Sequence, residues 1–243
     1  MTHWHWKKIA RQWRGDAQSL GCCWDKSRLT MVHIRKYFRG LEVAHLISWS
    51  LSETGLSGLA PQVAHTVAEN GLEGLPVALT INHGSNFIKK IKLPLAASEN
   101  LAQVVSYELD RFIPLDPEQV WFNFQVARKT ETEVHLNLFT VHKKPVEECL
   151  ELLKAAGLKP VSVELAPVSN ANAFALLGGR LPASWLLLDL VGEKAEIYHI
   201  NKGKLEPCLL WAHRSTAGIG PDVRRTVEAL GETGSPVGAV CLA

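Results

Sequence analysis

Residues 107–115, Tyr-Glu-Leu-Asp-Arg-Phe-Ile-Pro-Leu, form the centre of the stretch 92–167, which decides the fold. Upstream of them, Ser98 and Glu99 supply a cap and a favourable charge for the start of a helix. Apolar residues then recur at three- and four-residue steps and share one helical face: Leu101, Val104, Val105, Leu109 and Phe112. Pro114 ends this helix, because proline has no amide hydrogen and moves the preceding residue out of the helical region.

Two alternating segments follow the proline and predict a β-hairpin. Residues 120–126 and 134–140 each alternate apolar and polar side chains, and the polar segment 128–132 lies between them. A second helix is expected from Pro145 to Gly157, and a strand from 160 to 165. The stretch is therefore predicted to form a compact unit of helix, hairpin, helix and strand.

Two short segments of this stretch carry a resemblance to a known family. Phe-Ile-Pro at 112–114 and Ala-Gly-Leu-Lys-Pro at 156–160 resemble segments of actin-like proteins in secretion and pilus platforms. These are the PilM family of type IV pili and the cytoplasmic domain of the GspL family of type II secretion. The resemblance covers roughly residues 76–220. It implies an α/β (α+β) fold of two ribonuclease-H-like lobes, with an α-β-β-α subdomain inserted in the first lobe and a reduced second lobe.

An internal repeat supports the same fold independently. Three strands, a helix and a strand are expected in the first half, and the same series recurs in the second half. The first series is 20–25, 29–36, 41–51, 60–69 and 76–81, and the second is 185–191, 194–200, 204–212, 222–230 and 236–242. The expected organisation is an N-terminal helix (1–18), a first lobe (19–96), an inserted subdomain (97–166) and a truncated second lobe (167–243).

The first eighteen residues are predicted to form a basic amphipathic helix. Trp6, Ile9, Ala10 and Trp13 make one stripe, and lysines and arginines occupy the other side. Residues 1–40 hold nine of the 26 bases and two of the 24 acids, so the remainder is acidic on balance. Three interpretations remain open: a packed or frayed terminal helix, a peripheral membrane contact, or a contact with an acidic partner. Nucleic acid is disfavoured, because no folded basic platform with stacking aromatics accompanies the helix.

Composition places this part of the chain in the cytoplasm. The chain has 243 residues, of which 47% are hydrophobic and 21% charged. No run reaches the roughly 18 apolar residues that span a bilayer, and no signal peptide is visible. A membrane anchor would therefore lie beyond Ala243 or belong to a partner. The five cysteines show no CxxC spacing and are expected to be reduced, and the ten histidines form no metal motif.

The resemblance implies a degenerate nucleotide site. Actin-like ATPases hold ATP and Mg²⁺ with two glycine-containing hairpin turns, each beside an aspartate. The first hairpin, 21–28, lacks this pattern, and Asp25 is interpreted as a turn residue. In the second half Asp189, Gly192 and Gly220 resemble the family's residues, with one extra residue between Asp189 and Gly192. ATP and Mg²⁺ are disfavoured as cofactors.

The end of the second lobe also departs from the ATPases. Only residues 232–235 separate its helix from its last strand, where full actin-like ATPases carry an inserted subdomain. This shortening favours GspL over complete PilM. No metal site and no catalytic residue are expected, so the chain is not predicted to be an enzyme.

The function implied by the resemblance is that of a non-catalytic platform domain associated with the inner membrane. Such domains link a hexameric assembly ATPase to inner-membrane platform proteins. Leu101, Phe112 and Trp121 are the candidate partner contacts, from the helix 101–112 and the strand 121–126. The alternatives are a nucleotide-binding actin-like switch that uses Asp189 and Gly192, and a membrane-surface or nucleic-acid adaptor that acts through the N-terminus.

Overall fold

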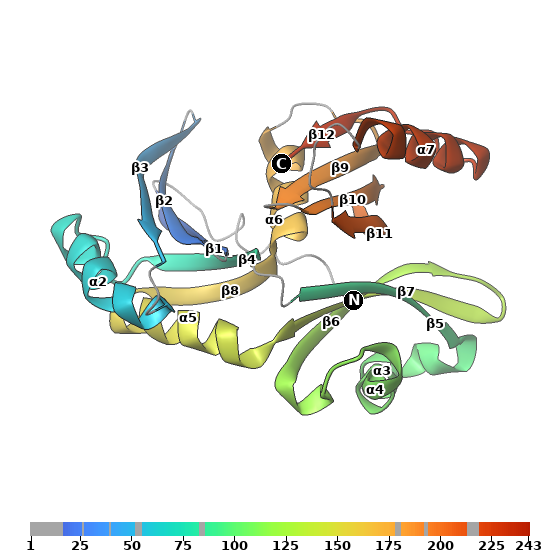
Figure 1. Ribbon diagram of the computed structural model, residues 1–243, viewed down its shortest axis with the longest axis horizontal. Helices are drawn as coiled ribbons and strands as arrows, with labels where there is room; N and C mark the ends of the chain where they lie inside the picture. The colour runs from blue at the N-terminus through green and yellow to red at the C-terminus, as the bar shows by residue number, and fades with distance from the viewer. Residues whose placement is uncertain are drawn as a thin grey trace. The chain divides into compact units, whose positions relative to one another are not determined.

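The computed structural model describes residues 17–25, 27–38, 40–51, 55–82, 86–177, 181–191, 194–212 and 219–243 (Figure 1). The chain divides into two compact units. Unit 1 comprises residues 1–86 and 141–166, and unit 2 comprises residues 87–140 and 167–243. Most of the predicted N-terminal helix lies outside the described residues, and its expected end at residue 18 falls inside a strand that begins at Ala17.

Unit 1 is built on a five-stranded sheet in the order β3-β2-β1-β4-β8. Its elements are β1 (Ala17–Asp25), β2 (Arg28–Tyr37), β3 (Gly40–Ser50), η1 (Gly55–Leu59), α2 (Ala60–Glu69), β4 (Pro76–Asn82), α5 (Lys143–Ala155) and β8 (Lys159–Leu165). The first three strands are antiparallel, and β4 runs parallel to both β1 and β8. Helices α2 and α5 pack against each other, as Figure 1 shows.

The core of unit 1 follows from strand periodicity. Leu20 and Cys22 on β1 pair with Val77 and Leu79 on β4, and all four side chains are buried on one face of the sheet. Helix α5 contributes its own buried stripe, Val146, Cys149, Leu152 and Leu153.

Unit 2 contains two sheets. The three-stranded sheet β5-β7-β6 consists of β5 (Asn86–Pro94), β6 (Val120–Lys129) and β7 (Glu133–His142), with η2 (Leu95–Glu99), α3 (Leu101–Tyr107), α4 (Leu109–Phe112) and η3 (Pro117–Gln119). The four-stranded sheet β11-β10-β9-β12 consists of β9 (Ser184–Val191), β10 (Lys194–Asn201), β11 (Lys204–Ala212) and β12 (Val240–Leu242), with α6 (Ala166–Leu177) and α7 (Ile219–Glu232). Strand β12 runs parallel to β9.

The predicted repeat is present as two separate sheets. Each has three antiparallel strands followed, after a helix, by a strand parallel to the first. The final strand is shorter than the 236–242 predicted and spans Val240–Leu242. The segment before it passes close to Pro182, since a Cβ on Gly238 would lie 2.8 Å from the proline ring. The segment still bonds to β9, since the Gly238 amide donates to the Ser184 carbonyl and the Leu186 amide donates to the Ala239 carbonyl, each at 2.9 Å.

The helix predicted over 101–112 is divided at Glu108. Its backbone angles are φ −104° and ψ 13°, outside the helical range, so α3 and α4 are separate turns. Their apolar faces nevertheless lie in one core, as the spacing predicted. Val105 and Leu109 pack with Ile113, Val120, Val134, Leu136 and Leu138, and with Ile91 and Leu93 of β5.

The face of β5-β7-β6 away from this core meets the second sheet of unit 2. The Asn137 side chain on β7 donates to the Leu205 carbonyl on β11 at 2.8 Å. The Lys204 ammonium donates to the Ala127 carbonyl at 2.7 Å. Among the residues that the structure describes, no helix combines the length and the hydropathy needed to cross a bilayer.

Candidate functional site

Asp189 is the candidate site residue that the fold buries most deeply. It lies on β9, directly opposite Glu196 on β10, and its side chain is only 2% exposed. The Asn170 amide of α6 approaches its Oδ1 at 3.5 Å. Its Oδ2 has no hydrogen-bond partner among the described residues. Within the part of the chain that the structure describes, one acceptor atom of this buried acid is therefore without a donor.

The surroundings of Asp189 favour its protonated form. Burial, and then the neighbouring Glu196, raise the pKa of Asp189 to about 6. The buried Tyr198 hydroxyl donates to Glu196 Oε2. Burial and the same glutamate raise the pKa of Tyr198, so this phenol stays protonated. A proton or a cation at Asp189 would relieve the repulsion between the two carboxylates.

The structure describes only one of the two glycines, Gly192 and Gly220, that were predicted to belong to the nucleotide site with Asp189. Gly192 lies outside the described residues. Gly220 lies in the first turn of α7, and a Cβ built there would meet no atom within 4 Å. The protein itself therefore does not require glycine at 220, and its assignment to a phosphate contact stays a prediction.

The first hairpin is organised around its own aspartate. Asp25 Oδ1 accepts hydrogen bonds from the Ser27 amide at 2.6 Å, the Ser27 hydroxyl at 2.7 Å and the Arg28 amide at 2.9 Å. Burial alone would raise the pKa of Asp25, but these hydrogen bonds and the Arg28 charge outweigh it and lower the pKa. The turn amides that would cradle a phosphate thus bind a carboxylate of the chain.

The two hairpins therefore differ in how well they suit a nucleotide and Mg²⁺. The unpartnered oxygen of Asp189 suits a cation, whereas the β1–β2 turn supplies a negative charge where phosphate needs donors. The described residues do not provide two matching phosphate turns.

The three predicted partner contacts separate into two groups. Leu101 and Phe112 are half-buried and pack against the hydrophobic core of unit 2. Trp121 is 38% exposed, on the opposite face of β6 from Phe122 and Phe124, which pack on that core. Trp121 is therefore the accessible contact of the three, and its assignment to a partner stays a prediction.

Two buried amides on the Trp121 side of the sheet were not predicted from the sequence. Gln125 lies two steps beyond Asn123 on β6, and its Oε1 has no partner among the described residues. Asn137 on β7 uses its NH₂ group on Leu205, and its Oδ1 is likewise unpartnered. Polar residues at alternate positions of two otherwise apolar strands were the available signal.

A histidine pair in unit 1 is a second polar cluster that sequence reasoning missed. His33 Nδ1 lies 3.1 Å from His45 Nδ1, and the rings stack with an interplanar angle of 11°. His33 Nε2 lies 2.9 Å from Gln18 Oε1. If His33 donates to Gln18, its Nδ1 is free to accept from His45, and the network is satisfied with both rings neutral.

No family model matches the chain, and no curated protein matches it. Solved structures do match. A PilM–PilN type IV pilus biogenesis complex aligns with TM-score 0.69 and 17% identity, covering 93% of this chain and 81% of that one. The cytoplasmic domain of EpsL, an inner-membrane component of the Vibrio cholerae type II secretion system, aligns with TM-score 0.57 and 14% identity, covering 93% and 86%.

A Bacteroides thetaiotaomicron protein with an actin-like ATPase fold aligns with TM-score 0.54 and 9% identity, covering 93% of this chain and 81% of that one. The TM-score is higher for the PilM complex than for EpsL, although the sequence favoured the GspL type. At these identities the likeness concerns the fold. The chain has the actin-like fold of the PilM and GspL type.

Proposed function

We propose that the chain is a non-catalytic platform domain of a type II secretion or type IV pilus assembly system. It would act in the cytoplasm, next to the inner membrane. The observation that carries this proposal is the β1–β2 turn, whose amides bind Asp25 in place of a phosphate. The likeness to a PilM–PilN complex and to an inner-membrane secretion component supports the same role.

The partners proposed for this platform are a hexameric assembly ATPase and the cytoplasmic segments of inner-membrane platform proteins. Trp121 is the proposed contact, because a half-exposed aromatic side chain on a rigid strand can bury a large area at little entropic cost. A peripheral membrane contact through the basic N-terminus remains part of the proposal.

The test is binding of the full chain to the purified assembly ATPase and to the partner segment, before and after Trp121→Ala. We expect a weakening of at least about thirtyfold for one partner, which corresponds to a hot spot of about 2 kcal/mol. Tyr37→Ala is the matched control, because Tyr37 is 44% exposed and lies on β2, outside both the helix 101–112 and the strand 121–126. If neither partner binds the unaltered chain, the platform assignment fails.

A nucleotide-binding switch is the second candidate, favoured by the unpartnered Oδ2 of buried Asp189. Titration with Mg·ATP separates it from the platform. Micromolar binding that Asp189→Asn abolishes would establish the switch. If Mg·ATP does not bind, or if it binds equally well after the substitution, the platform is the better-supported function.

A further inference from the structure

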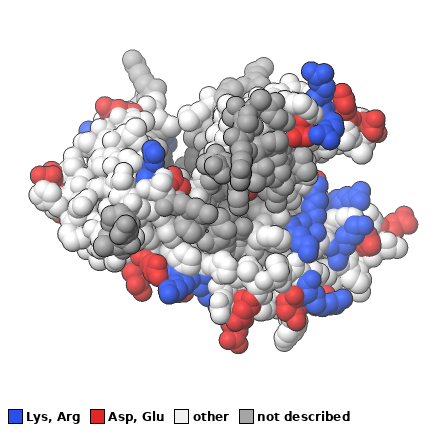
Figure 2. All heavy atoms as spheres, in the orientation of Figure 1, with Lys and Arg blue, Asp and Glu red and all other residues white. Residues whose placement is uncertain are grey.

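One side of unit 2 carries a concentration of basic side chains, shown in blue in Figure 2. We define the basic surface as six residues from three segments that meet there. They are Lys90 and Lys92 on β5, Arg128 and Lys129 at the end of β6, and Lys202 and Lys204 at the β10–β11 turn. Three acids, Glu131, Glu133 and Glu206, lie on the same segments, so positive charge is in excess.

Contacts within unit 2 hold the three segments together. The hydrogen bond from Lys204 to the Ala127 carbonyl fixes the β10–β11 turn beside the end of β6. The ion pair between Lys90 Nζ and Glu206 Oε2, at 3.3 Å, ties β5 to β11. The basic surface is therefore an arrangement of rigid strand ends, and it persists without a ligand.

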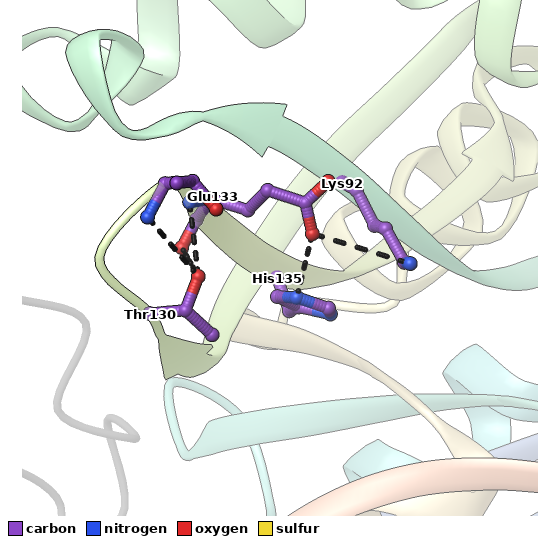
Figure 3. Close-up of polar contacts among 5 residues, drawn as sticks. Lys92, Thr130, Glu133 and His135 are labelled. Atoms are coloured by element: carbon purple, nitrogen blue, oxygen red, sulfur yellow. Dashed lines mark hydrogen bonds and ion pairs between the residues drawn. The ribbon is translucent and has the colours of Figure 1, made fainter.

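Glu133 positions one edge of the surface, as Figure 3 shows. Its carboxylate lies 4.0 Å from Lys92 Nζ and 3.2 Å from His135 Nε2. Its amide donates to the Thr130 hydroxyl at 3.0 Å, which closes the β6–β7 turn. Lys92 still exposes 65% of its side chain and Lys90 exposes 53%. Both ammonium groups therefore remain accessible to an incoming anion.

Lys202 has a backbone conformation that lysine rarely adopts. Its φ is +49°, in the left-handed region, within the two-residue turn Lys202-Gly203. Asn or Gly is favoured at this position of a tight hairpin, because lysine is strained there. The turn thus places an exposed cation where a neutral residue would be more stable. Replacing Lys202 by asparagine therefore removes the cation without disfavouring the turn.

The chemistry of the surface favours one class of partner. The strand ends and the turn that carry it hold none of the large hydrophobic side chains that the described residues expose, and Trp121 lies at the other end of β6, so the surface offers no anchor for a bilayer. None of its six residues is aromatic, and His135 at its edge exposes only 15% of its side chain, so a base finds no open ring on which to stack. Five of its six bases are lysines, which act as point charges and attract any anion. With neither a hydrophobic anchor for a bilayer nor a stacking ring for a base, the excess positive charge is best complemented by the carboxylates of a protein segment.

We propose that the basic surface docks an acidic, Asp- and Glu-rich segment of a protein partner. The inference rests on the proposed function in one respect, since it takes the chain to be a scaffold. The inference adds that one partner is acidic, and it places the contact of that partner at the basic surface. Trp121 lies near the start of β6, whereas the basic residues of this strand lie at its end.

The probe is a short fluorescent peptide of alternating Glu and Ser, titrated onto the full chain at low salt. The variant Arg128→Glu, Lys129→Glu, Lys202→Glu should weaken binding by on the order of tenfold or more, and salt should weaken it similarly. The control variant Lys144→Glu, Lys154→Glu, Arg224→Glu makes the same charge change at exposed positions elsewhere. Equal weakening in the two variants would overturn the proposal.

The substitution Lys202→Asn distinguishes an effect on peptide binding from an effect on the stability of the fold. It should raise the stability of the chain, because asparagine tolerates the left-handed turn, and yet weaken peptide binding severalfold. Unchanged binding would argue against the proposal. So would tighter binding of phosphatidylglycerol vesicles or single-stranded DNA than of the peptide, through the same three residues. Peptide binding without any ATPase or platform partner would instead count against the proposed function alone.

Discussion

Asp189 is a buried acid, and one of its oxygens has no hydrogen-bond partner among the described residues. Its burial fixes the sign of its effect on stability. Its pKa is raised from the ordinary value to about 6 in the folded chain. Its contribution to folding is therefore complete below the unfolded pKa and is lost as pH rises through about 6. At neutral pH and above, an ionised Asp189 destabilises the protein.

We expect Asp189→Asn to stabilise the chain at about pH 8 by up to about 3 kcal/mol, from the size of the pKa shift. Near pH 4 the gain should be close to zero, because Asp189 is then protonated in both states. Urea unfolding of both proteins across this pH range measures the effect. A gain that is the same at all pH values would contradict the assigned pKa.

The pair of His33 and His45 predicts the opposite dependence. Burial, and then Arg35 and His45, lower the pKa of His33, so the folded chain prefers the neutral ring. Its stabilising contribution is present above the unfolded pKa near 6.5 and is lost as pH falls. His33→Gln should reduce the loss of thermal stability between about pH 7 and about pH 5. If the variant loses as much stability as the unaltered chain, the pair is not the cause.

At the scale of single residues, the sequence predicted groups with a local signature and missed groups made by distant contacts. Asp189 could be named from its hairpin, and Asp25 could be interpreted as a turn residue from its neighbours. The hydrogen bond between Asn137 and Leu205 joins residues 68 positions apart, and no sequence pattern in either segment predicts it. The same holds for His33 and His45, which meet only through the register of β2 and β3.

At the scale of elements, the approach of the segment before β12 to Pro182 gives a direct test. Gly238→Ala should destabilise the chain by about 1–3 kcal/mol, because its Cβ would lie 2.8 Å from the Pro182 ring. Thermal unfolding measures this. Gly231→Ala, in α7, is the control, since its Cβ would meet no atom within 4 Å. There we expect a small stabilisation, as alanine is the better helix former.

The elements themselves were mostly predictable, and their ends were not. Periodicity located the hairpin β6–β7 and the buried faces of α3, α4 and α5, because these depend on residues close in sequence. The break at Glu108 escaped prediction, because the apolar stripe continues through it from Val105 to Leu109. The start of β12 at Val240, four residues after the predicted start at 236, also escaped prediction.

At the scale of the whole molecule, the two sheets of unit 2 should unfold together. Asn137→Ala removes the donor that the buried Leu205 carbonyl uses and should destabilise unit 2 by about 1–3 kcal/mol. Hydrogen exchange should then accelerate in both β7 and β11. Asn123→Ala, at an exposed position of β6, is the control and should leave both strands unchanged. Faster exchange confined to β7 would show that the sheets are independent.

The repeated series of three strands, a helix and a strand could be predicted from the sequence. The assignment of α5 and β8 to unit 1 could not. The four-part division of the chain stays a prediction as a set of domain boundaries. Within the expected insertion 97–166, however, β8 pairs with β4 and α5 packs with α2, so both lie in unit 1. Their sequence follows the hairpin directly, and only strand pairing reveals that the chain has returned to the first sheet.

The pairing of β8 with the much earlier strand β4 has a consequence for folding during translation. On the ribosome, β4 emerges well before its neighbour β8, because residues 83–158 are translated between them. At ordinary elongation rates the delay is on the order of ten seconds. During it the nascent chain presents β4, with Val77, Leu79 and Ile81, as an unprotected parallel edge. Chaperone occupancy should therefore peak in this interval and fall once Leu165 has left the exit tunnel.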